Sequence, residues 1–376
     1  MKKKELFVYF EPQESGQTTH VLSLVNGLNK DKYDITIVLP AHLHRSLSTF
    51  SQTGAVIIPL PMRKIFWSPK SIQALFRLIR RQKFDIAHVH SQEAGLLVRV
   101  IARAAGAQVI IYTPQCTNIG HARWYWLYRS IEKILSFITD KVISVSATDR
   151  RRIIRWGIPS SKVITIKNGI DPKINRETLD IARMKQDLDL DEKQPVVMQV
   201  GRLSYQKNPL AFVKGASIVN REYPDVQFVL IGNGPQMDEV EDYIQELGIN
   251  EQVHCLGWQD NAFNLIAVAD ILTLTSRWEG LPYVLLEAMA WSCPVVTTAV
   301  NGCPEVVKHG VTGYLVPDED INTWAMYVKK LLENDKKSED MGRSGNSRLK
   351  EDFSLEKMLE QTEEIYDNLL IDPKKS

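Results

Sequence analysis

The stretch Ser276-Arg-Trp-Glu-Gly-Leu-Pro-Tyr-Val-Leu-Leu-Glu-Ala-Met-Ala290 follows a short apolar run, Ile271–Thr275, with the length and composition of a buried strand. Within it, Gly280 allows the backbone to approach a ligand closely, and Pro282 suits the first turn of a helix. The order is therefore strand, tight loop and helix, which is the building block of a parallel α/β sheet.

Two carboxylates belong to this unit, with Glu279 in the loop and Glu287 one turn into the helix. Helical side chains lean toward the N-terminus of their helix, so Glu287 can reach the space above the first turn. The free N–H groups of that turn and the positive end of the helix dipole attract anions. A ligand with a phosphate and several hydroxyls fits this place; solvated helix-end carboxylates are the alternative interpretation.

The composition is that of an ordinary globular protein. A chain of 376 residues is too long for one core and indicates two domains. It is 44% hydrophobic and 24% charged, and its formal net charge is only +1, so we expect no general affinity for polyanions and no nucleic-acid partner. The cysteines are scattered, which favours free thiols over disulfides or a metal site. They are Cys116, Cys255, Cys293 and Cys303.

The N-terminal segment Met1–Glu5 runs directly into a strand-like run, Leu6–Phe10, and does not resemble a signal peptide. No apolar run of about 18 residues, the length that a membrane-spanning helix needs, occurs in the sequence. We therefore expect a cytoplasmic protein.

Short β-rich runs alternate with helical patterns in the first half, which predicts a parallel, doubly wound sheet. The strand-like runs are Leu6–Phe10, Ile35–Leu39, Ala55–Pro59, Ile86–His90, Val109–Thr113, Val142–Val145 and Val163–Ile166. The helical patterns are Thr18–Leu28, Ser71–Gln82, Ala94–Ala105, Trp124–Ile138 and Thr148–Arg155. Ligands bind at the carboxyl ends of the strands in such sheets, so the loops that follow the strands matter most.

Two of these loops contain candidate ligand contacts. Gly16 lies in a polar turn before a helix, where it could present backbone N–H groups or simply complete the turn. His88 and His90 lie two positions apart on a strand and so face the same side. A polar strand end is the favoured interpretation of these histidines.

A second strand–helix series begins at Pro195–Val200 and includes the opening stretch. Its first loop carries Arg202 and Lys207, a planar fork and a mobile point charge that together suit a diphosphate. A later loop carries Gly232 and Gly234, a partial match to a dinucleotide fingerprint. Each signal is weak when it is taken alone.

The motifs in their order are more specific. Gly201-Arg-Leu-x-x-x-Lys-Asn-Pro, Gly232-x-Gly-Pro, Glu279-Gly-Leu-Pro with Glu287, and Pro294-Val-Val-x-Thr occur in succession. This pattern resembles the nucleotide-binding half of the retaining glycosyltransferases of family four, which have the GT-B fold. The resemblance extends over nearly the whole chain and is looser in the first half.

The resemblance implies two Rossmann-like domains facing across a cleft. Residues 1–170 would form the acceptor-binding domain, 171–194 the connection, 195–353 the nucleotide-sugar-binding domain, and 354–376 a helix that crosses back to the first domain. The implied substrates are a nucleoside-diphosphate sugar and a carbohydrate or lipid-linked acceptor. No cofactor and no metal ion are implied, since arginine, lysine and a helix dipole supply the positive charge.

The resemblance also implies roles for single residues. Arg202 and Lys207 would bind the donor diphosphate and stabilise the leaving group. Glu279 would bind the transferred sugar, and Glu287 the ribose hydroxyls. The other implied donor contacts are Gly280 and Leu281 at the distal phosphate, Trp258 near the base, Gly16 over the phosphates, and Gly232 and Gly234 in the nucleotide-binding loop.

One position departs from the family pattern. Many members have a Thr-Pro-His-Gly motif after the fifth strand, whose histidine contacts the donor sugar, whereas this chain has Gln115 at the histidine position. Glutamine can form hydrogen bonds but cannot carry a proton, which argues against acid–base chemistry there. His90 and His121 are candidate substitutes as sugar or acceptor contacts.

We expect transfer of a sugar to an acceptor hydroxyl with retention, with UDP-sugars favoured over GDP-sugars. The setting would be cell-surface polysaccharide or glycolipid synthesis. A nucleotide-sugar 2-epimerase of the same fold and a catalytically inactive nucleotide-sugar-binding subunit are the alternatives. A phosphorylase would need a longer chain and a cofactor lysine site.

Two basic segments suggest a membrane surface near the acceptor. Arg63 to Lys83 contains seven Lys or Arg and no Asp or Glu, and Arg123 to Arg155 contains eight basic and three acidic residues. The second segment also carries an aromatic-rich amphipathic pattern, typical of proteins on the inner face of a membrane. The alternative is that these aromatic residues pack in the core. The oligomeric state is not indicated.

Overall fold

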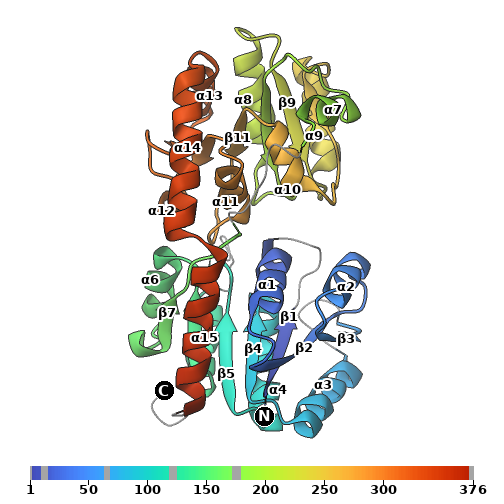
Figure 1. Ribbon diagram of the computed structural model, residues 1–376, viewed down its shortest axis with the longest axis vertical. Helices are drawn as coiled ribbons and strands as arrows, with labels where there is room; N and C mark the ends of the chain where they lie inside the picture. The colour runs from blue at the N-terminus through green and yellow to red at the C-terminus, as the bar shows by residue number, and fades with distance from the viewer. Residues whose placement is uncertain (1, 10–15, 63–67, 118–124, 172–178, 372–376) are drawn as a thin grey trace. The chain divides into compact units, whose positions relative to one another are not determined.

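The computed structural model describes residues 2–9, 16–62, 68–117, 125–171 and 179–371, and these residues fold as two compact units. The N-terminal unit contains residues 1–169 and 355–376, and the C-terminal unit contains residues 170–354. Each unit is a parallel sheet with helices on both faces (Figure 1). The fold class predicted from the sequence is confirmed.

The described part of the N-terminal unit has a seven-stranded sheet in the order β3-β2-β1-β4-β5-β6-β7. Its strands are β1 (Lys3–Tyr9), β2 (Tyr33–Pro40), β3 (Val56–Leu60), β4 (Ile86–His90), β5 (Val109–Thr113), β6 (Lys141–Ser144) and β7 (Val163–Thr165). The two central strands β4 and β5 are buried along their whole length, as expected for parallel strands covered on both faces.

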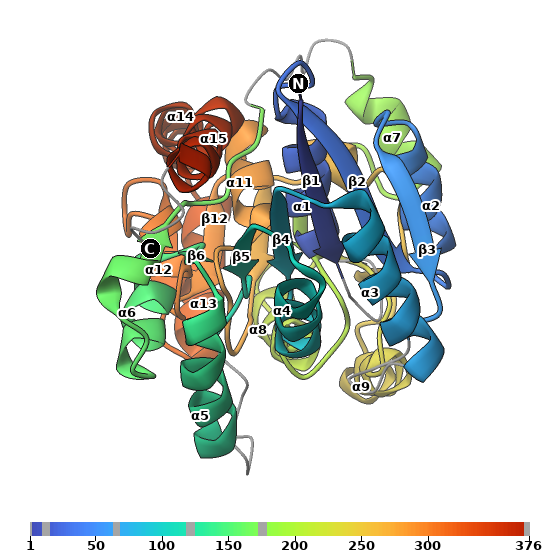
Figure 2. The same cartoon turned by 90° about the horizontal axis from the view of Figure 1, so that it is seen from below.

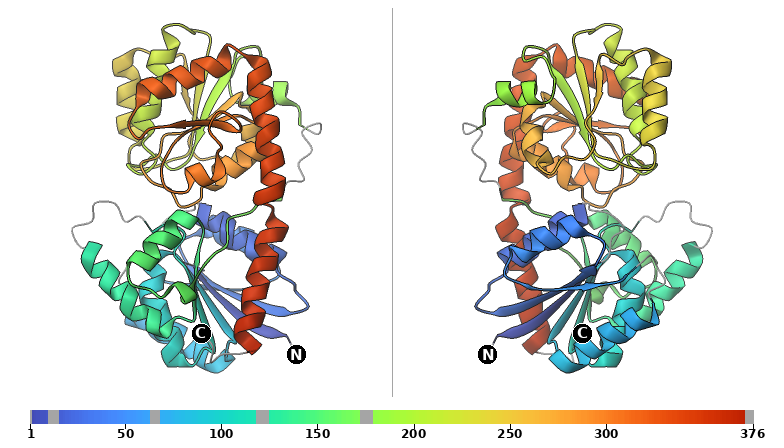
Figure 3. Two further views of the ribbon diagram at one scale, coloured as in Figure 1. Left: turned by 90° about the vertical axis from the view of Figure 1, so that its left-hand side faces the viewer. Right: turned by 90° about the vertical axis from the view of Figure 1, so that its right-hand side faces the viewer.

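Helices form two layers on this sheet, each with its own apolar core. One layer contains α3 (Pro69–Gln82), α4 (Gln92–Ala105), α5 (Tyr125–Leu135) and α6 (Ala147–Arg155). The other contains α1 (Gly16–Gly27), α2 (His44–Ser51) and α15 (Leu355–Ile371). The last helix therefore packs on the N-terminal unit, where it contacts α1 (Figure 3).

The described part of the C-terminal unit has a six-stranded sheet in the order β10-β9-β8-β11-β12-β13. Its strands are β8 (Val196–Val200), β9 (Gln227–Ile231), β10 (Val253–Cys255), β11 (Ile271–Leu274), β12 (Val295–Thr298) and β13 (Gly313–Val316). Its helices are α7 (Ile181–Asp187), α8 (Pro209–Asn220), α9 (Met237–Leu247), α10 (Ala262–Leu265), α11 (Tyr283–Ala290), α12 (Cys303–Val306), α13 (Ile321–Leu332) and α14 (Asp335–Asp352).

Both sheets reverse direction of winding at one place, between β1 and β4 in the first and between β8 and β11 in the second. Loops that leave neighbouring strands in opposite directions open a crevice at this point. In the C-terminal unit, the two loops at this position are those that contain Lys207 and Glu279. The topology therefore places the two strongest sequence motifs at the expected ligand-binding position.

Local differences from the sequence prediction are small. Pro282 is the residue before α11 rather than a member of its first turn. Helix α2 was not anticipated, because its polar sequence, His44–Ser51, buries only Ser46 and Phe50 fully. The segment expected to connect the domains contains α7, which packs within the C-terminal unit against the short helical turn Ile266–Val268.

Candidate functional site

The loops after β8 and β11 are joined by two hydrogen bonds. The backbone N–H of Arg277 donates to the carbonyl of Gln206 at 2.8 Å, and the side-chain amide of Gln206 donates to the carbonyl of Trp278 at 3.0 Å. These contacts hold the neighbouring residues Lys207 and Glu279 at a fixed separation.

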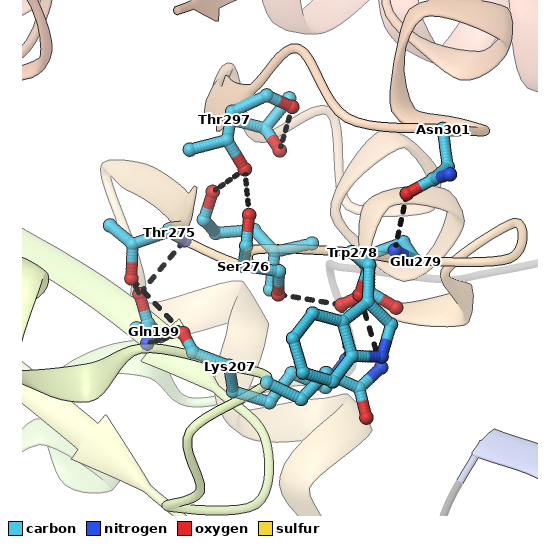
Figure 4. Close-up of polar contacts among 11 residues, drawn as sticks. Gln199, Lys207, Thr275, Ser276, Trp278, Glu279, Thr297 and Asn301 are labelled. Atoms are coloured by element: carbon cyan, nitrogen blue, oxygen red, sulfur yellow. Dashed lines mark hydrogen bonds and ion pairs between the residues drawn. The ribbon is translucent and has the colours of Figure 1, made fainter. Parts of the chain in front are cut away.

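Lys207 and Glu279 form an ion pair, with the ammonium 2.5 Å from one carboxylate oxygen (Figure 4). The same oxygen accepts a hydrogen bond from the hydroxyl of Ser276 at 2.6 Å. The backbone N–H of Glu279 donates to the side chain of Asn301 at 3.3 Å. Glu279 is only 5% exposed, and both of these side-chain contacts are made by the same carboxylate oxygen, so its carboxylate has a defined position.

Arg202 differs from Lys207 in being exposed, and no described residue forms a hydrogen bond or an ion pair with its guanidinium group. The group is therefore available to an anionic ligand. The backbone of Gly280 and Leu281 forms the turn that leads into α11, whose N-terminal N–H groups attract anions. Two cationic side chains and one helix N-terminus thus belong to adjacent loops.

Glu287 lies on the second turn of α11 and is half-buried. Burial raises the pKa of Glu287 to about 7, and the positive charge of Lys207 lowers it only in part. The influence of Lys207 shows that both carboxylates of the opening stretch lie in the field of the same ammonium group. A carboxyl group with this pKa changes its charge near neutral pH.

Gly232 and Gly234 have a clear packing role. A Cβ atom on Gly232 would lie 2.1 Å from the carbonyl oxygen of Gly201, and one on Gly234 would lie 2.1 Å from that of Leu203. Gly232 also has a φ of +131°, which side chains rarely adopt. These glycines let the loop after β9 pack backbone to backbone against the loop that carries Arg202.

The loop after β10 joins the same edge, because the N–H of Gly232 donates to the carbonyl of Gly257 at 2.7 Å. Trp258, the next residue, is 37% exposed and donates its indole N–H to Asp260 at 2.8 Å. An exposed indole held in this way offers a flat apolar surface for a base.

Arg277 links three residues around the site. Its guanidinium donates to the side chain of Asn208 at 3.2 Å, pairs with Glu319, and stacks 4.4 Å from the ring centre of Tyr205. Asn208 adopts a left-handed conformation with φ of +51°, directly after Lys207. Arg277 therefore stabilises the strained turn that orients Lys207.

The N-terminal unit contains a different set of groups at the carboxyl ends of β4 and β5. His88 and His90 have ring centres 4.0 Å apart, and His20 from α1 lies 5.4 Å from His90. His88 is hydrogen bonded to Tyr366 at 2.7 Å and to Thr113 at 2.8 Å. His88 and His90 stand at the end of β4, as expected from the sequence, and both side chains are buried beside His20 of α1 and Tyr366 of α15.

Burial lowers the pKa of all three histidines, to about 4 for His20, so the cluster is neutral near pH 7. His90 is fully buried, and neither of its ring nitrogens has a hydrogen-bond partner among the described residues. Gln115 is 8% exposed with φ of +65°, and its side-chain nitrogen likewise has no partner within the described ranges. These two side chains retain free hydrogen-bonding atoms.

Gly16 is the first residue of α1 and is exposed. His121 lies outside the described residues. All four cysteines are free thiols. In the described part of the chain, no group of three His, Cys, Asp or Glu side chains is arranged to hold a metal ion.

Sequence reasoning missed Ser276, Asn301 and Arg277 as supports of the site. Ser276 stands three positions before Glu279, a spacing from which a hydroxyl can reach the carboxylate. Asn301 and Arg277 gave no local signal, because their partners are 22 and 69 positions away.

Comparisons with known proteins agree with this geometry. The model of the family described as glycosyl transferases group 1 matches residues 180–348, and that of glycosyltransferase family 4 matches residues 15–174. The Escherichia coli UDP-Gal:alpha-D-GlcNAc-diphosphoundecaprenol alpha-1,3-galactosyltransferase is 26% identical over 98% of both chains. The Bacillus anthracis N-acetyl-alpha-D-glucosaminyl L-malate synthase is 27% identical over 78% of this chain and 77% of its own.

Solved structures show the same architecture. The Anabaena protein HepE, solved in complex with UDP and glucose, superposes with a TM-score of 0.87 at 19% identity, over 98% of this chain and 100% of its own. Since the two family models together span both units, this chain belongs to the group 1 glycosyltransferases of family four, which have the GT-B fold.

Proposed function

We propose that the protein transfers a hexose from a nucleoside-diphosphate sugar to an acceptor hydroxyl with retention of configuration. The observation that carries the proposal is the Lys207–Glu279 pair beside the N-terminus of α11, with Arg202 free in the adjacent loop. Cationic groups and helix N–H groups suit a diphosphate, and a buried carboxylate suits sugar hydroxyls.

Lys207 and Arg202 would bind the diphosphate, and Lys207 would then exchange Glu279 for phosphate oxygens. The released Glu279 would hydrogen bond to the transferred sugar and stabilise positive charge at its anomeric carbon. Glu287, in its ionised form, would accept hydrogen bonds from the ribose. Because these groups supply the charge compensation, we propose that the reaction needs no metal ion.

We favour a front-face reaction. The bond between the anomeric carbon and the phosphate oxygen breaks, and its electron pair leaves with the nucleoside diphosphate. The acceptor oxygen bonds to the same face of the anomeric carbon, and its proton passes to the leaving phosphate. A covalent intermediate would need a nucleophilic carboxylate about 5 Å from an acid partner. In the front-face reaction Glu279 stabilises positive charge and does not act as a nucleophile.

A UDP-sugar is the favoured donor, because the E. coli relative is named for UDP-Gal and HepE was solved with UDP. The name of the E. coli relative also specifies an acceptor on diphosphoundecaprenol. We propose a polysaccharide or glycolipid acceptor for this chain. Its lipid-linked form would bring the enzyme to the inner face of the membrane as a peripheral protein. None of the described helices is long and apolar enough to cross a bilayer.

The test is the release of UDP or GDP from a panel of nucleotide sugars by the Arg202→Ala and Lys207→Ala variants. Each variant should lose about 10²- to 10³-fold in turnover, the effect of removing one group that stabilises charge in a transition state. Lys214→Ala and Arg221→Ala, which remove exposed cations from the same unit, are matched controls. Full activity of both site variants would contradict the assignment.

The products and the metal requirement are measured in the same assay. The anomeric configuration of the product, determined by NMR, tests retention, and activity after chelation tests independence from metal ions. A changed nucleotide sugar formed without any acceptor would instead indicate an epimerase.

A further inference from the structure

Helix α5 and the turn that follows it, Ser136–Ile138, present large apolar side chains to solvent. The exposed fractions are 62% for Trp126, 65% for Ile134 and 79% for Phe137. A spacing of eight residues brings Trp126 and Ile134 to one side of a helix with 3.6 residues per turn, and Phe137 follows in the turn after the helix. Together with Arg129 and Lys133, which are exposed between them, we name this set the α5 face.

The opposite side of α5 is firmly held in the N-terminal unit. Glu132 accepts hydrogen bonds from Arg99 through both carboxylate oxygens at 2.8 Å, and neither side chain is exposed. The indole N–H of Trp156 donates to the hydroxyl of Tyr125 at 2.9 Å, and its ring lies 5.5 Å from that of Tyr128. The described aromatic residues of α5 are therefore divided, with Tyr125 and Tyr128 packed against the core and Trp126 exposed.

The electrostatic character of this region is positive. Residues 125–155 contain seven Lys or Arg and three Asp or Glu. All three acidic groups are already engaged: Glu132 with Arg99, Asp140 with Arg103 at 2.6 Å, and Asp149 with Thr117 and Ser146. The exposed charges left on α5 are those of Arg129 and Lys133.

A second basic helix, α3, belongs to the same helical layer, separated from α5 by α4 (Figure 2). Its exposed side chains include Lys70, Arg77 and Arg81, and Phe76 is 37% exposed beside them. The outer side of this layer therefore combines apolar and cationic groups over more than one helix.

We propose that the α5 face is a docking surface for an anionic lipid bilayer. Apolar side chains on a rigid helix can enter the headgroup region, and Trp126 suits the interface between headgroups and acyl chains. Arg129 and Lys133 then lie at the level of the lipid phosphates and are attracted to them. This proposal extends the proposed function, and it rests on that function for the choice of a lipid-linked acceptor.

A second copy of the chain is a poorer occupant. A symmetric dimer through the α5 face would bring Arg129 and Lys133 of both copies into the same interface. Such like-charge contacts cost free energy, whereas an anionic bilayer neutralises both groups.

The experiment is flotation of the full chain with phosphatidylcholine vesicles, with and without phosphatidylglycerol, at physiological salt. The wild type should float with the anionic vesicles and not with the zwitterionic ones. A variant with Trp126→Ser, Ile134→Ser and Phe137→Ser should bind the anionic vesicles at least about tenfold more weakly. The emission of Trp126, obtained by subtracting the spectrum of Trp126→Phe, should shift to shorter wavelength on binding.

The matched control carries Val311→Ser, Met326→Ser and Ile371→Ser, which removes three other exposed apolar side chains. It should bind vesicles as the wild type does. Equal binding by the α5-face variant and the wild type, or no binding of the wild type to anionic vesicles, would overturn the proposal. A change of molecular mass in solution caused by the α5-face variant would show a contact between copies instead and would also overturn it.

Turnover with a soluble acceptor separates this proposal from the proposed function. The α5-face variant should retain that turnover while it loses vesicle binding. Lys207→Ala should show the opposite pattern. It should lose turnover and keep vesicle binding, because Lys207 belongs to the donor site.

Discussion

The two sheets share one winding pattern, but the polar groups at their carboxyl ends differ in charge. The C-terminal unit has Arg202, Lys207 and Glu279 there, with Lys207 and Glu279 paired at 2.5 Å. The N-terminal unit has buried, neutral histidines and Gln115, with unpartnered atoms on His90 and Gln115 among the described residues. One scaffold thus carries charged groups at the carboxyl ends of one sheet and neutral groups at those of the other.

This difference suits two kinds of ligand. A diphosphate needs positive charge at a defined position, and in the C-terminal unit the pairing with Glu279 fixes the position of the Lys207 ammonium group. Neutral hydroxyls need hydrogen-bonding groups that do not attract anions, and His90 and Gln115 are of this kind. We therefore expect charge-removing substitutions to impair the chemical step in the C-terminal unit much more than neutral substitutions do in the N-terminal unit.

The largest expected effect comes from Glu279→Gln, which removes the charge and keeps the shape. It should lower kcat about 10³-fold, since the carboxylate no longer stabilises positive charge at the anomeric carbon. His90→Asn should change kcat by less than about tenfold and act mainly on the KM of the acceptor. Steady-state kinetics of both variants, with folding checked by circular dichroism, measure this contrast. Similar losses of kcat would break it.

A smaller effect concerns Glu5, a fully buried carboxyl group on β1 of the N-terminal unit. Burial raises its pKa from 4.5 to about 8, and the nearby Tyr366 hydroxyl offsets only part of this. Between these values the unfolded chain releases the proton and the folded chain keeps it, so the stability of the wild type falls as pH rises from 4.5 to 8.

Glu5→Gln removes this dependence and should be more stable than the wild type by on the order of 5 kcal/mol above pH 8, with no gain below pH 4.5. Urea denaturation across this pH range provides the measurement, and Glu246→Gln on the surface of α9 is the control. A constant difference at every pH would mean that folding does not raise the pKa of Glu5 and that this carboxyl group is ionised in the N-terminal unit at neutral pH.

The smallest effect is expected at Glu287, whose pKa of about 7 places its ionisation within the working range. Ribose hydroxyls donate to the ionised form, so the affinity for a UDP-sugar should rise about tenfold from pH 6 to pH 8. The diphosphate diester of the ligand keeps a constant charge over this range. Calorimetric titration should show that Glu287→Gln abolishes the pH dependence. A variant that retains the full dependence would assign it to another group.

The parallel, doubly wound sheets and most element bounds could be predicted because buried parallel strands are short apolar runs followed by turns. Strands such as Ile86–His90 and Val109–Thr113 have the predicted bounds. Helix α2 escaped prediction since its pattern is polar, and its position is set by the few residues that it buries against the sheet. A local sequence pattern therefore predicts an element well where consecutive residues of that element are buried.

The site was predictable only in part. Arg202, Lys207, Glu279 and Glu287 stand in motifs that are local in sequence, and the structure brings their loops together. The pairing of Lys207 with Glu279 joins residues 72 positions apart, and the bond from His88 to Tyr366 joins residues 278 positions apart. Such contacts depend on the complete fold, so the burial of the histidines and the supports from Asn301 and Arg277 had no local signal.

The return of α15 to the N-terminal unit has a consequence for biosynthesis. Met358, Ile365 and Tyr366 complete one of the two cores of this unit, although they follow the whole C-terminal unit in the chain. During translation, the C-terminal unit has all its strands before the N-terminal unit can close that core. Part of this core in residues 1–169 therefore stays uncovered until residues 355–371 have been synthesised, and we expect chaperones to bind the newly made chain during that time.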